Sequence, residues 1–177
     1  MPDEIYYDNS ATTRTREEAA KLVYEMLTEC YGNPSSLHRK GFEAQKCLDK
    51  AREQVALSLG CQSSEIYFTS GGTEADNIAI LGAARAQKRR GNRIVTTAFE
   101  HDAVLNTVKY LDSEGWEIVR LMPDANGQIT PEQVLEAVDD KTVLVSIMAV
   151  NNEIGSILPI GAISRQLRRK YPQLLIH

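Results

Sequence analysis

The sequence is poor in cysteine, in excess basic charge and in long apolar runs, and each shortage excludes a class of protein. Its 177 residues include only three cysteines, whose spacing matches no zinc-binding pattern, so neither a disulfide framework nor a metal site is expected. Lysine and arginine total 20 against 24 acidic residues, which gives a net charge of −4. Such a chain lacks the electrostatic footprint of a nucleic-acid-binding protein.

Membrane and secretory features are also missing. No apolar run approaches the roughly 18 residues that a membrane-spanning helix needs. The first residues lack the basic and apolar regions of a secretory signal. Few cysteines suit a reducing compartment, and 42% hydrophobic residues suffice for the core of one domain. The sequence therefore predicts a soluble, cytoplasmic protein with no nucleic-acid or membrane partner.

Helix-like and strand-like segments alternate along the chain. We predict helices over residues 16–30, 37–59, 73–90, 101–113, 131–138 and 159–170. We predict strands over residues 65–69, 93–97, 116–122, 142–150 and 174–176. This alternation is typical of βαβ units, so we expect an α/β fold of three layers, α/β/α, with a mainly parallel sheet covered on both faces.

In such sheets, ligands bind beyond the carboxyl ends of the strands, and the first polar turn there spans residues 70–73. Gly71 and Gly72 let the backbone approach a ligand closely, and the free N–H groups of the following helix form an anion site. The same residues also suit an ordinary helix cap. The turn lacks the Gly-Lys-Ser/Thr of a P-loop and the third glycine of the dinucleotide fingerprint. A phosphate remains its natural ligand.

Two further turns, at residues 98–101 and 151–155, are expected at the same edge. His101 can stack on a flat ring or move protons near neutral pH, or it can be an exposed or capping histidine. Asn151 and Asn152 can recognise a phenolic or carboxylate oxygen, although asparagine also favours turns for local reasons. Together the three turns predict a pocket for a phosphorylated aromatic cofactor.

Five segments occur in an order shared with one enzyme family. They are YDNSATT at 7–13, GNPSSLH at 32–38, FTSGGTEADN at 68–77, EHDAVL at 100–105 and VSIMAVNNEIG at 145–155. The chain resembles the N-terminal portion of the cysteine desulfurases, which are class V aminotransferase-like enzymes dependent on pyridoxal 5′-phosphate (PLP). The resemblance implies an N-terminal arm over 1–15 and a partial, cofactor-binding large domain of PLP fold type I over 16–177.

The resemblance also implies roles for individual residues. Gly72 and Thr73 would hold the cofactor phosphate, and His101 would stack on the pyridine ring and assist proton transfer. Asn152 would hydrogen-bond the phenolic oxygen of the ring near the substrate carboxylate, while Asn151 would be more structural. The loops at 11–13 and 33–38 would border the active site, where the dimer interface of the family also lies.

The implied reaction takes sulfur from L-cysteine, giving L-alanine and an enzyme persulfide. That sulfur would pass to an acceptor or iron–sulfur scaffold protein, for cluster or thio-cofactor assembly. The asparagine-rich and GNPSS motifs favour a desulfurase over the nearest rivals, a selenocysteine lyase or another class V PLP enzyme. A homodimer is expected.

The residues that complete this chemistry in the family are expected beyond residue 177. They are the aspartate that pairs with the pyridinium nitrogen, the lysine that binds PLP and the persulfide cysteine. Lys170 is expected to be a solvated cation at a helix end, and Cys30, Cys47 and Cys61 to be structural. We therefore expect a fragment that is inactive alone. The alternatives are a non-catalytic truncated copy and one half of a split enzyme that acts with a complementing C-terminal half.

Overall fold

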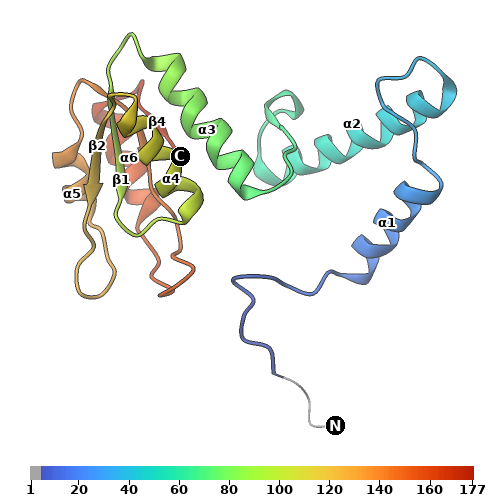
Figure 1. Ribbon diagram of the computed structural model, residues 1–177, viewed down its shortest axis with the longest axis horizontal. Helices are drawn as coiled ribbons and strands as arrows, with labels where there is room; N and C mark the ends of the chain where they lie inside the picture. Colours follow the sequence, from blue (N-terminus) through green and yellow to red (C-terminus); the bar gives the residue numbers. More distant parts are fainter. Residues whose placement is uncertain (1–4) are drawn as a thin grey trace. The chain divides into compact units, whose positions relative to one another are not determined.

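The computed structural model of the chain describes residues 5–177 (Figure 1). The chain divides into two compact units, the first ending at Phe68 and the second running from Thr69 to His177. Residues 5–16 contain neither helix nor strand. The predicted arm over 1–15 falls largely in this segment, and its first four residues lie outside the described residues. The predicted boundary between residues 15 and 16 stays a prediction.

The first unit contains helices α1 (Glu17–Thr28) and α2 (Arg39–Leu59) and a short 3₁₀ helix η1 (Ser63–Glu65). The start of α2 is capped by His38, whose side chain accepts a hydrogen bond from the Gly41 N–H at 3.3 Å. Its end is Gly60, which adopts the left-handed conformation at φ 68° that glycine tolerates best. Both predicted helices are confirmed, with ends shifted by at most two residues.

The predicted strand over residues 65–69 is wrong. Glu65 closes η1, and the extended backbone at Ile66 pairs with no strand among the described residues. Instead, Arg52 of α2 donates to the Ile66 carbonyl at 3.3 Å and lies over the Phe68 ring at 5.3 Å. Strand-forming residue types make a strand only when a neighbouring strand accepts their backbone hydrogen bonds, so their pattern alone misled the prediction.

The second unit is built around a parallel sheet. Its helices are α3 (Gly72–Gln87), α4 (Asp102–Ser113), α5 (Pro131–Ala137) and α6 (Ile160–Lys170). Its strands are β1 (Arg93–Thr97), β2 (Glu117–Leu121), β3 (Thr142–Ser146) and β4 (Leu175–Ile176). The sheet order is β2-β1-β3-β4, and every pairing is parallel. The predicted α/β fold with a mainly parallel sheet is confirmed.

Two apolar clusters cover the two faces of this sheet. One joins β1 and β3 to α3 and α4, through residues such as Ile94, Val108 and Leu144. The other joins the same strands to α5 and α6, through residues such as Val95 and Leu167. All five residues of β3 are buried, as expected for a strand covered on both faces. The three-layer arrangement predicted from the alternating pattern is therefore present in this unit.

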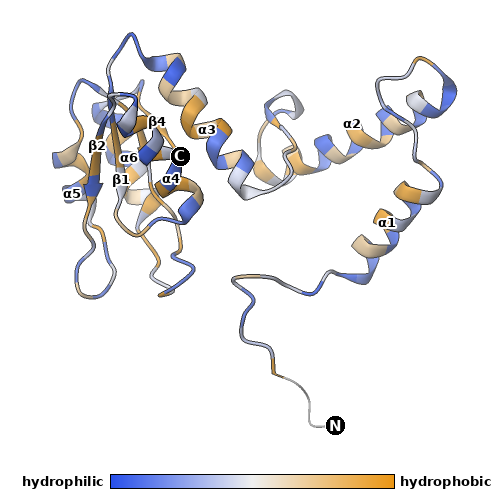
Figure 2. Cartoon of the chain, in the orientation of Figure 1, coloured by the Kyte–Doolittle hydropathy of each residue, from blue (hydrophilic) through white to orange (hydrophobic). Residues whose placement is uncertain are grey.

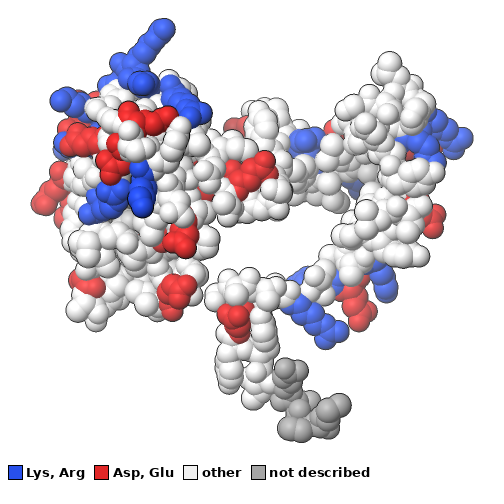
Figure 3. Space-filling model, in the orientation of Figure 1, with Lys and Arg blue, Asp and Glu red and all other residues white. Residues whose placement is uncertain are grey.

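The amino ends of the strands are held by an ion-pair cluster. Arg93, at the start of β1, contacts Glu117 of β2 at 2.6 Å and Asp139 at 2.8 Å. The hydrogen bond from Arg93 lowers the pKa of the Glu117 carboxyl below its ordinary value. Basic and acidic side chains intermix over the face of this unit drawn in Figure 3. The carboxyl ends of the strands, at the opposite end of the sheet, lie away from this ion-pair cluster.

Hydropathy varies along each of the long helices (Figure 2). None of the helices within residues 5–177 is both long enough and apolar enough to span a membrane.

Candidate active site

The turn before α3 is a helix start stabilised by a carboxylate. Glu74 accepts hydrogen bonds from the backbone N–H and the hydroxyl of Ser70, at 2.6 and 2.7 Å. These bonds lower the pKa of the Glu74 carboxyl, the backbone bond being the larger cause. A Cβ added to Gly71 or Gly72 would meet no atom within 4 Å, so the turn is open. Because the first N–H groups of a helix have no partner within it, this turn can cap the helix and also face an anion.

His101 caps the next helix along the chain. Its Nδ1 accepts the Ala103 N–H at 3.1 Å, at the start of α4. The predicted capping contact is therefore present. In the neutral ring this bond places the proton on Nε2, which remains available for other contacts.

A cavity of about 270 Å³, here the Thr73 pocket, brings together two of the predicted site residues. It is lined by Thr73, Asn77, His101, Asp102, Ala103, Asn106, Thr107 and Tyr110. Asn77 holds this wall in place, since its amide donates to the Thr73 carbonyl at 2.8 Å and its oxygen accepts the Thr107 hydroxyl at 2.8 Å. The pocket thus combines a helix N-terminus, a hydroxyl and an imidazole.

A second cavity of about 280 Å³, here the Glu100 pocket, shares His101 with the first. It is lined by Asp76, Glu100, His101, Val104, Ser146, Ile147, Met148 and His177. The His177 ring lies between the Ser146 hydroxyl, 2.9 Å from Nδ1, and the Asp76 carboxylate, 3.4 Å from Nε2. Sequence reasoning did not single out Asp76, Glu100 or His177, although Glu100 lies three residues beyond the end of β1 and directly precedes His101.

Glu100 is a buried carboxylate with two donors on one oxygen. Its Oε1 accepts the Thr97 hydroxyl at 2.7 Å and the Met148 backbone N–H at 2.9 Å. Removal from water raises the pKa of the Glu100 carboxyl, and these two hydrogen bonds oppose that rise. The Met148 N–H is thereby taken from the sheet. Strand β3 ends at Ser146, and not at Val150 as predicted.

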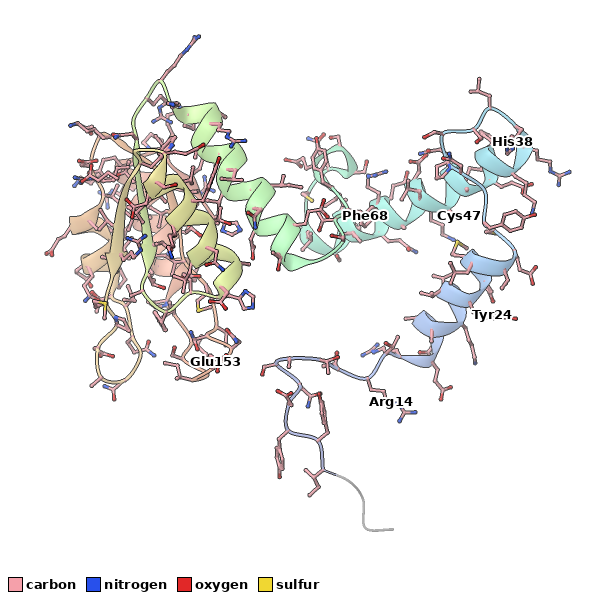
Figure 4. All side chains as sticks on the ribbon, viewed as in Figure 1. Arg14, Tyr24, His38, Cys47, Phe68 and Glu153 are labelled. Carbon is pink, nitrogen blue, oxygen red and sulfur yellow. The ribbon has the colours of Figure 1, made fainter. Side chains whose placement is uncertain are left out.

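The loop after β3 places its two asparagines differently. Asn151 is buried, and its amide donates to the Phe99 carbonyl at 2.8 Å while its oxygen accepts the Glu153 and Ile154 N–H groups. Asn152 is exposed and contacts Glu153 at 3.1 Å (Glu153 is labelled in Figure 4). Among the predicted site residues, Thr73 and His101 therefore line one pocket, Gly72 precedes Thr73 directly in the chain, and Asn152 lines neither pocket.

A larger cavity of about 530 Å³ belongs to the first unit and has another character. It lies between α1 and α2, and its lining is mostly apolar, including Leu22, Met26, Ala44 and Leu48. Cys30 and Cys47 also line it. These two cysteines and Cys61 are free thiols. Within residues 5–177, no group of three or more metal-ligating side chains is arranged to hold a metal ion.

One family model matches the whole described chain. The family model described as "Aminotransferase class-V" matches residues 5–177. The chain belongs to the class-V aminotransferase family. This confirms the resemblance noted in the sequence.

The chain is similar to a protein named as a cysteine desulfurase and to two solved structures. The chain is 44% identical over 170 residues to "Cysteine desulfurase IscS" of Clostridium botulinum (strain Hall), covering 96% of this chain and 43% of that relative. A solved structure described as "NIFS-LIKE PROTEIN" matches with a TM-score of 0.94 and 41% identity, over 98% of this chain and 48% of that one. Another, "SspA in complex with cysteine", matches with a TM-score of 0.90 and 34% identity, over 97% and 49%. The chain spans about half the length of these proteins.

Proposed function

We propose that this chain forms the phosphate-binding and ring-binding part of a PLP-dependent cysteine desulfurase. The observation that carries the proposal is the Thr73 pocket, in which a helix N-terminus and His101 line one cavity of about 270 Å³. The name of the Clostridium botulinum relative supports the activity. The SspA structure is described as a complex with cysteine, which supports L-cysteine as the substrate.

The residues present fit the phosphate of PLP. Gly72 and Thr73 begin α3, where unpartnered N–H groups and the helix dipole favour an anion. Open space around Gly71 and Gly72 allows a phosphate to approach the backbone. The nearby Glu74 carboxylate is already engaged by Ser70. Gly72 would therefore contribute its N–H, and Thr73 its N–H and hydroxyl.

The remaining roles belong to His101 and Asn152. His101 would stack on the cofactor ring and hold or move a proton at Nε2, because its Nδ1 is occupied by the Ala103 N–H. Asn152 lines neither pocket, so a hydrogen bond from Asn152 to the phenolic oxygen rests on the sequence resemblance alone. When bound, PLP supplies an electron sink for negative charge that develops on the substrate. The residues of this chain would bind and orient the cofactor, and His101 would hold or move a proton beside it.

The complete reaction needs groups from outside these 177 residues. We propose that a cofactor-binding lysine and a persulfide cysteine come from polypeptide beyond this sequence, because the chain covers only 43% of its desulfurase relative. L-alanine would be released, and sulfur would pass to an acceptor or iron–sulfur scaffold protein. A cytoplasmic homodimer, or a pair with a complementing C-terminal half, is the assembly we propose.

The binding step can be tested with PLP as the probe. The dissociation constant of PLP should rise about tenfold in Thr73→Ala, because a hydrogen bond to a charged phosphate is lost. Thr130→Ala is the matched control, since Thr130 caps α5 and lines neither pocket. Equal affinity of the wild type and Thr73→Ala would contradict the phosphate assignment.

The reaction can be tested on the native protein and whatever polypeptide accompanies it. Release of alanine from L-cysteine, together with sulfide when a reducing thiol is added to cleave the persulfide, supports the desulfurase. Turnover of selenocysteine alone would point to a selenocysteine lyase. Failure to bind PLP or release either product would favour a non-catalytic copy.

A further inference from the structure

Two turns of the second unit frame the site, and side chains tie them to each other. The first turn, residues 97–101, leaves β1 and carries His101 at its end. The second turn, residues 147–151, leaves β3. Glu100 reaches from the first turn to the Met148 N–H, at 2.9 Å, and Asn151 reaches back from the second to the Phe99 carbonyl, at 2.8 Å.

We propose that Glu100 is a positioning residue for His101. Its buried carboxylate fastens the turn that carries His101 to the backbone after β3, and so fixes where the imidazole lies in the wall shared by the two pockets. The inference rests on the proposed function, since the place of the imidazole matters to a cofactor ring only if the Thr73 pocket binds one.

The contacts of Glu100 explain why a carboxylate is suited to this position. Glu100 is 7% exposed and Thr97 is fully buried. The hydroxyl of Thr97 and the N–H of Met148 converge on one oxygen, at 2.7 and 2.9 Å. A side chain that cannot accept hydrogen bonds would leave both donors buried and unpartnered, which is costly. The tie that Glu100 makes to the backbone after β3 would then be lost, and the Asn151–Phe99 hydrogen bond would remain.

Because of the position of Glu100 in the chain, His101 is the residue that loss of this tie would displace. His101 follows Glu100 directly and begins α4 by accepting the Ala103 N–H at 3.1 Å. That contact selects the ring form protonated at Nε2. If the turn shifts, the Nδ1 contact is weakened, and the imidazole samples other orientations and the other tautomer.

The test uses the imidazole nitrogen signals of His101 by nuclear magnetic resonance, recorded about two pH units above the ordinary histidine pKa. The wild type and Glu100→Gln should both show the Nε2-protonated ring, because the glutamine oxygen still accepts both donors. Glu100→Ala should show a mixture of tautomers. Its Met148 amide should exchange with solvent about tenfold faster, as expected for the loss of one hydrogen bond.

A milder variant keeps the proposal testable if Glu100→Ala does not fold. Thr97→Val keeps the carboxylate and removes one of its donors, so the His101 signals should move in the same direction by a smaller amount. The matched control is Thr142→Val. Thr142 is a buried threonine at the other end of β3, and its hydroxyl bonds Asp139 at 2.9 Å. It should lower the unfolding temperature without changing the His101 signals.

The outcomes separate this inference from the proposed function. Unchanged His101 signals in a folded Glu100→Ala protein, or in Thr97→Val if only that variant folds, overturn the positioning role even if PLP binds the wild type. If PLP binds none of the proteins, the proposed function fails, while the unliganded spectra still decide the role of Glu100. If PLP binds, its affinity should be weaker for Glu100→Ala than for Glu100→Gln.

Discussion

The two units of this chain use similar helical patterns with very different results. In the second unit, both faces of the sheet are covered, and Ile80, Ile94 and Leu111 are completely buried. In the first unit, α1 buries none of its residues, and Leu27 is 73% exposed. An amphipathic pattern therefore specifies a helix in both places. In the second unit the sheet buries the apolar side of the helices, whereas in the first unit α1 keeps no buried residue although it faces α2.

The largest expected difference between the units is in local stability. In native-state hydrogen exchange of the 177-residue chain, β3 amides should open only by global unfolding, at a cost of about 5–15 kcal/mol. The amides of α1 should open at nearly no cost, because a 12-residue helix with no buried residue is marginal in water. Equal protection of α1 and β3 would show that the comparison is wrong.

A pair of identical substitutions should sharpen the comparison at the level of single side chains. Leu144→Ala, at a position 1% exposed in β3, should lower the free energy of unfolding by about 2–5 kcal/mol, because it leaves a cavity. Leu27→Ala in α1 should change it by less than about 0.5 kcal/mol.

Urea unfolding measures both effects when it is followed by the fluorescence of Trp116 for the second unit and by far-ultraviolet circular dichroism for the helices of both units. Trp116 is the sole tryptophan and is buried in the cluster that contains Leu144. A loss in Leu27→Ala as large as that in Leu144→Ala would mean that α1 is packed as tightly as the sheet.

The smallest expected effect is a pH dependence of stability in the second unit. It distinguishes the buried charge of Glu100 from the space that its side chain fills, because glutamine has nearly the same shape without the charge. Burial raises the pKa of Glu100 in the folded chain, so the folded state binds this proton more tightly than the unfolded state. The stability of the wild type relative to Glu100→Gln should therefore fall as pH rises from the ordinary glutamate pKa through the raised value. Asp76, His101 and His177 line the same pocket and are present in both proteins.

Urea unfolding of both proteins over a pH series measures this difference. Glu136→Gln, on the exposed side of α5, controls for the loss of one negative charge. A stability difference between wild type and Glu100→Gln that does not vary with pH would contradict the buried-charge explanation.

The sequence predicted elements well where the determining pattern is local. Strand β1 was predicted over residues 93–97 and is found there, since a short β-branched run follows the Gly91–Asn92 helix stop. The strand predicted at 65–69 failed because strand formation depends on a distant partner, and Arg52 of α2 takes the Ile66 carbonyl instead.

The site shows the same division between local and distant information. Thr73 and His101 were predicted because each lies at a recognisable helix start, and they line one cavity. Glu100 was missed because its significance depends on Met148, which is 48 residues away in the sequence. No local pattern indicates that a carboxylate after β1 will bond a backbone N–H after β3.

The ion-pair cluster around Arg93 has a practical consequence for experiments on this protein. It lies at the amino ends of the strands, and His101 follows the carboxyl end of β1, about one strand length or roughly 16 Å away. A spectroscopic probe on the exposed Asp140, next to the Asp139 that Arg93 contacts, would report the melting of the sheet. Such a probe would leave the pocket residues untouched, so folding and ligand binding can be followed as separate signals in one sample.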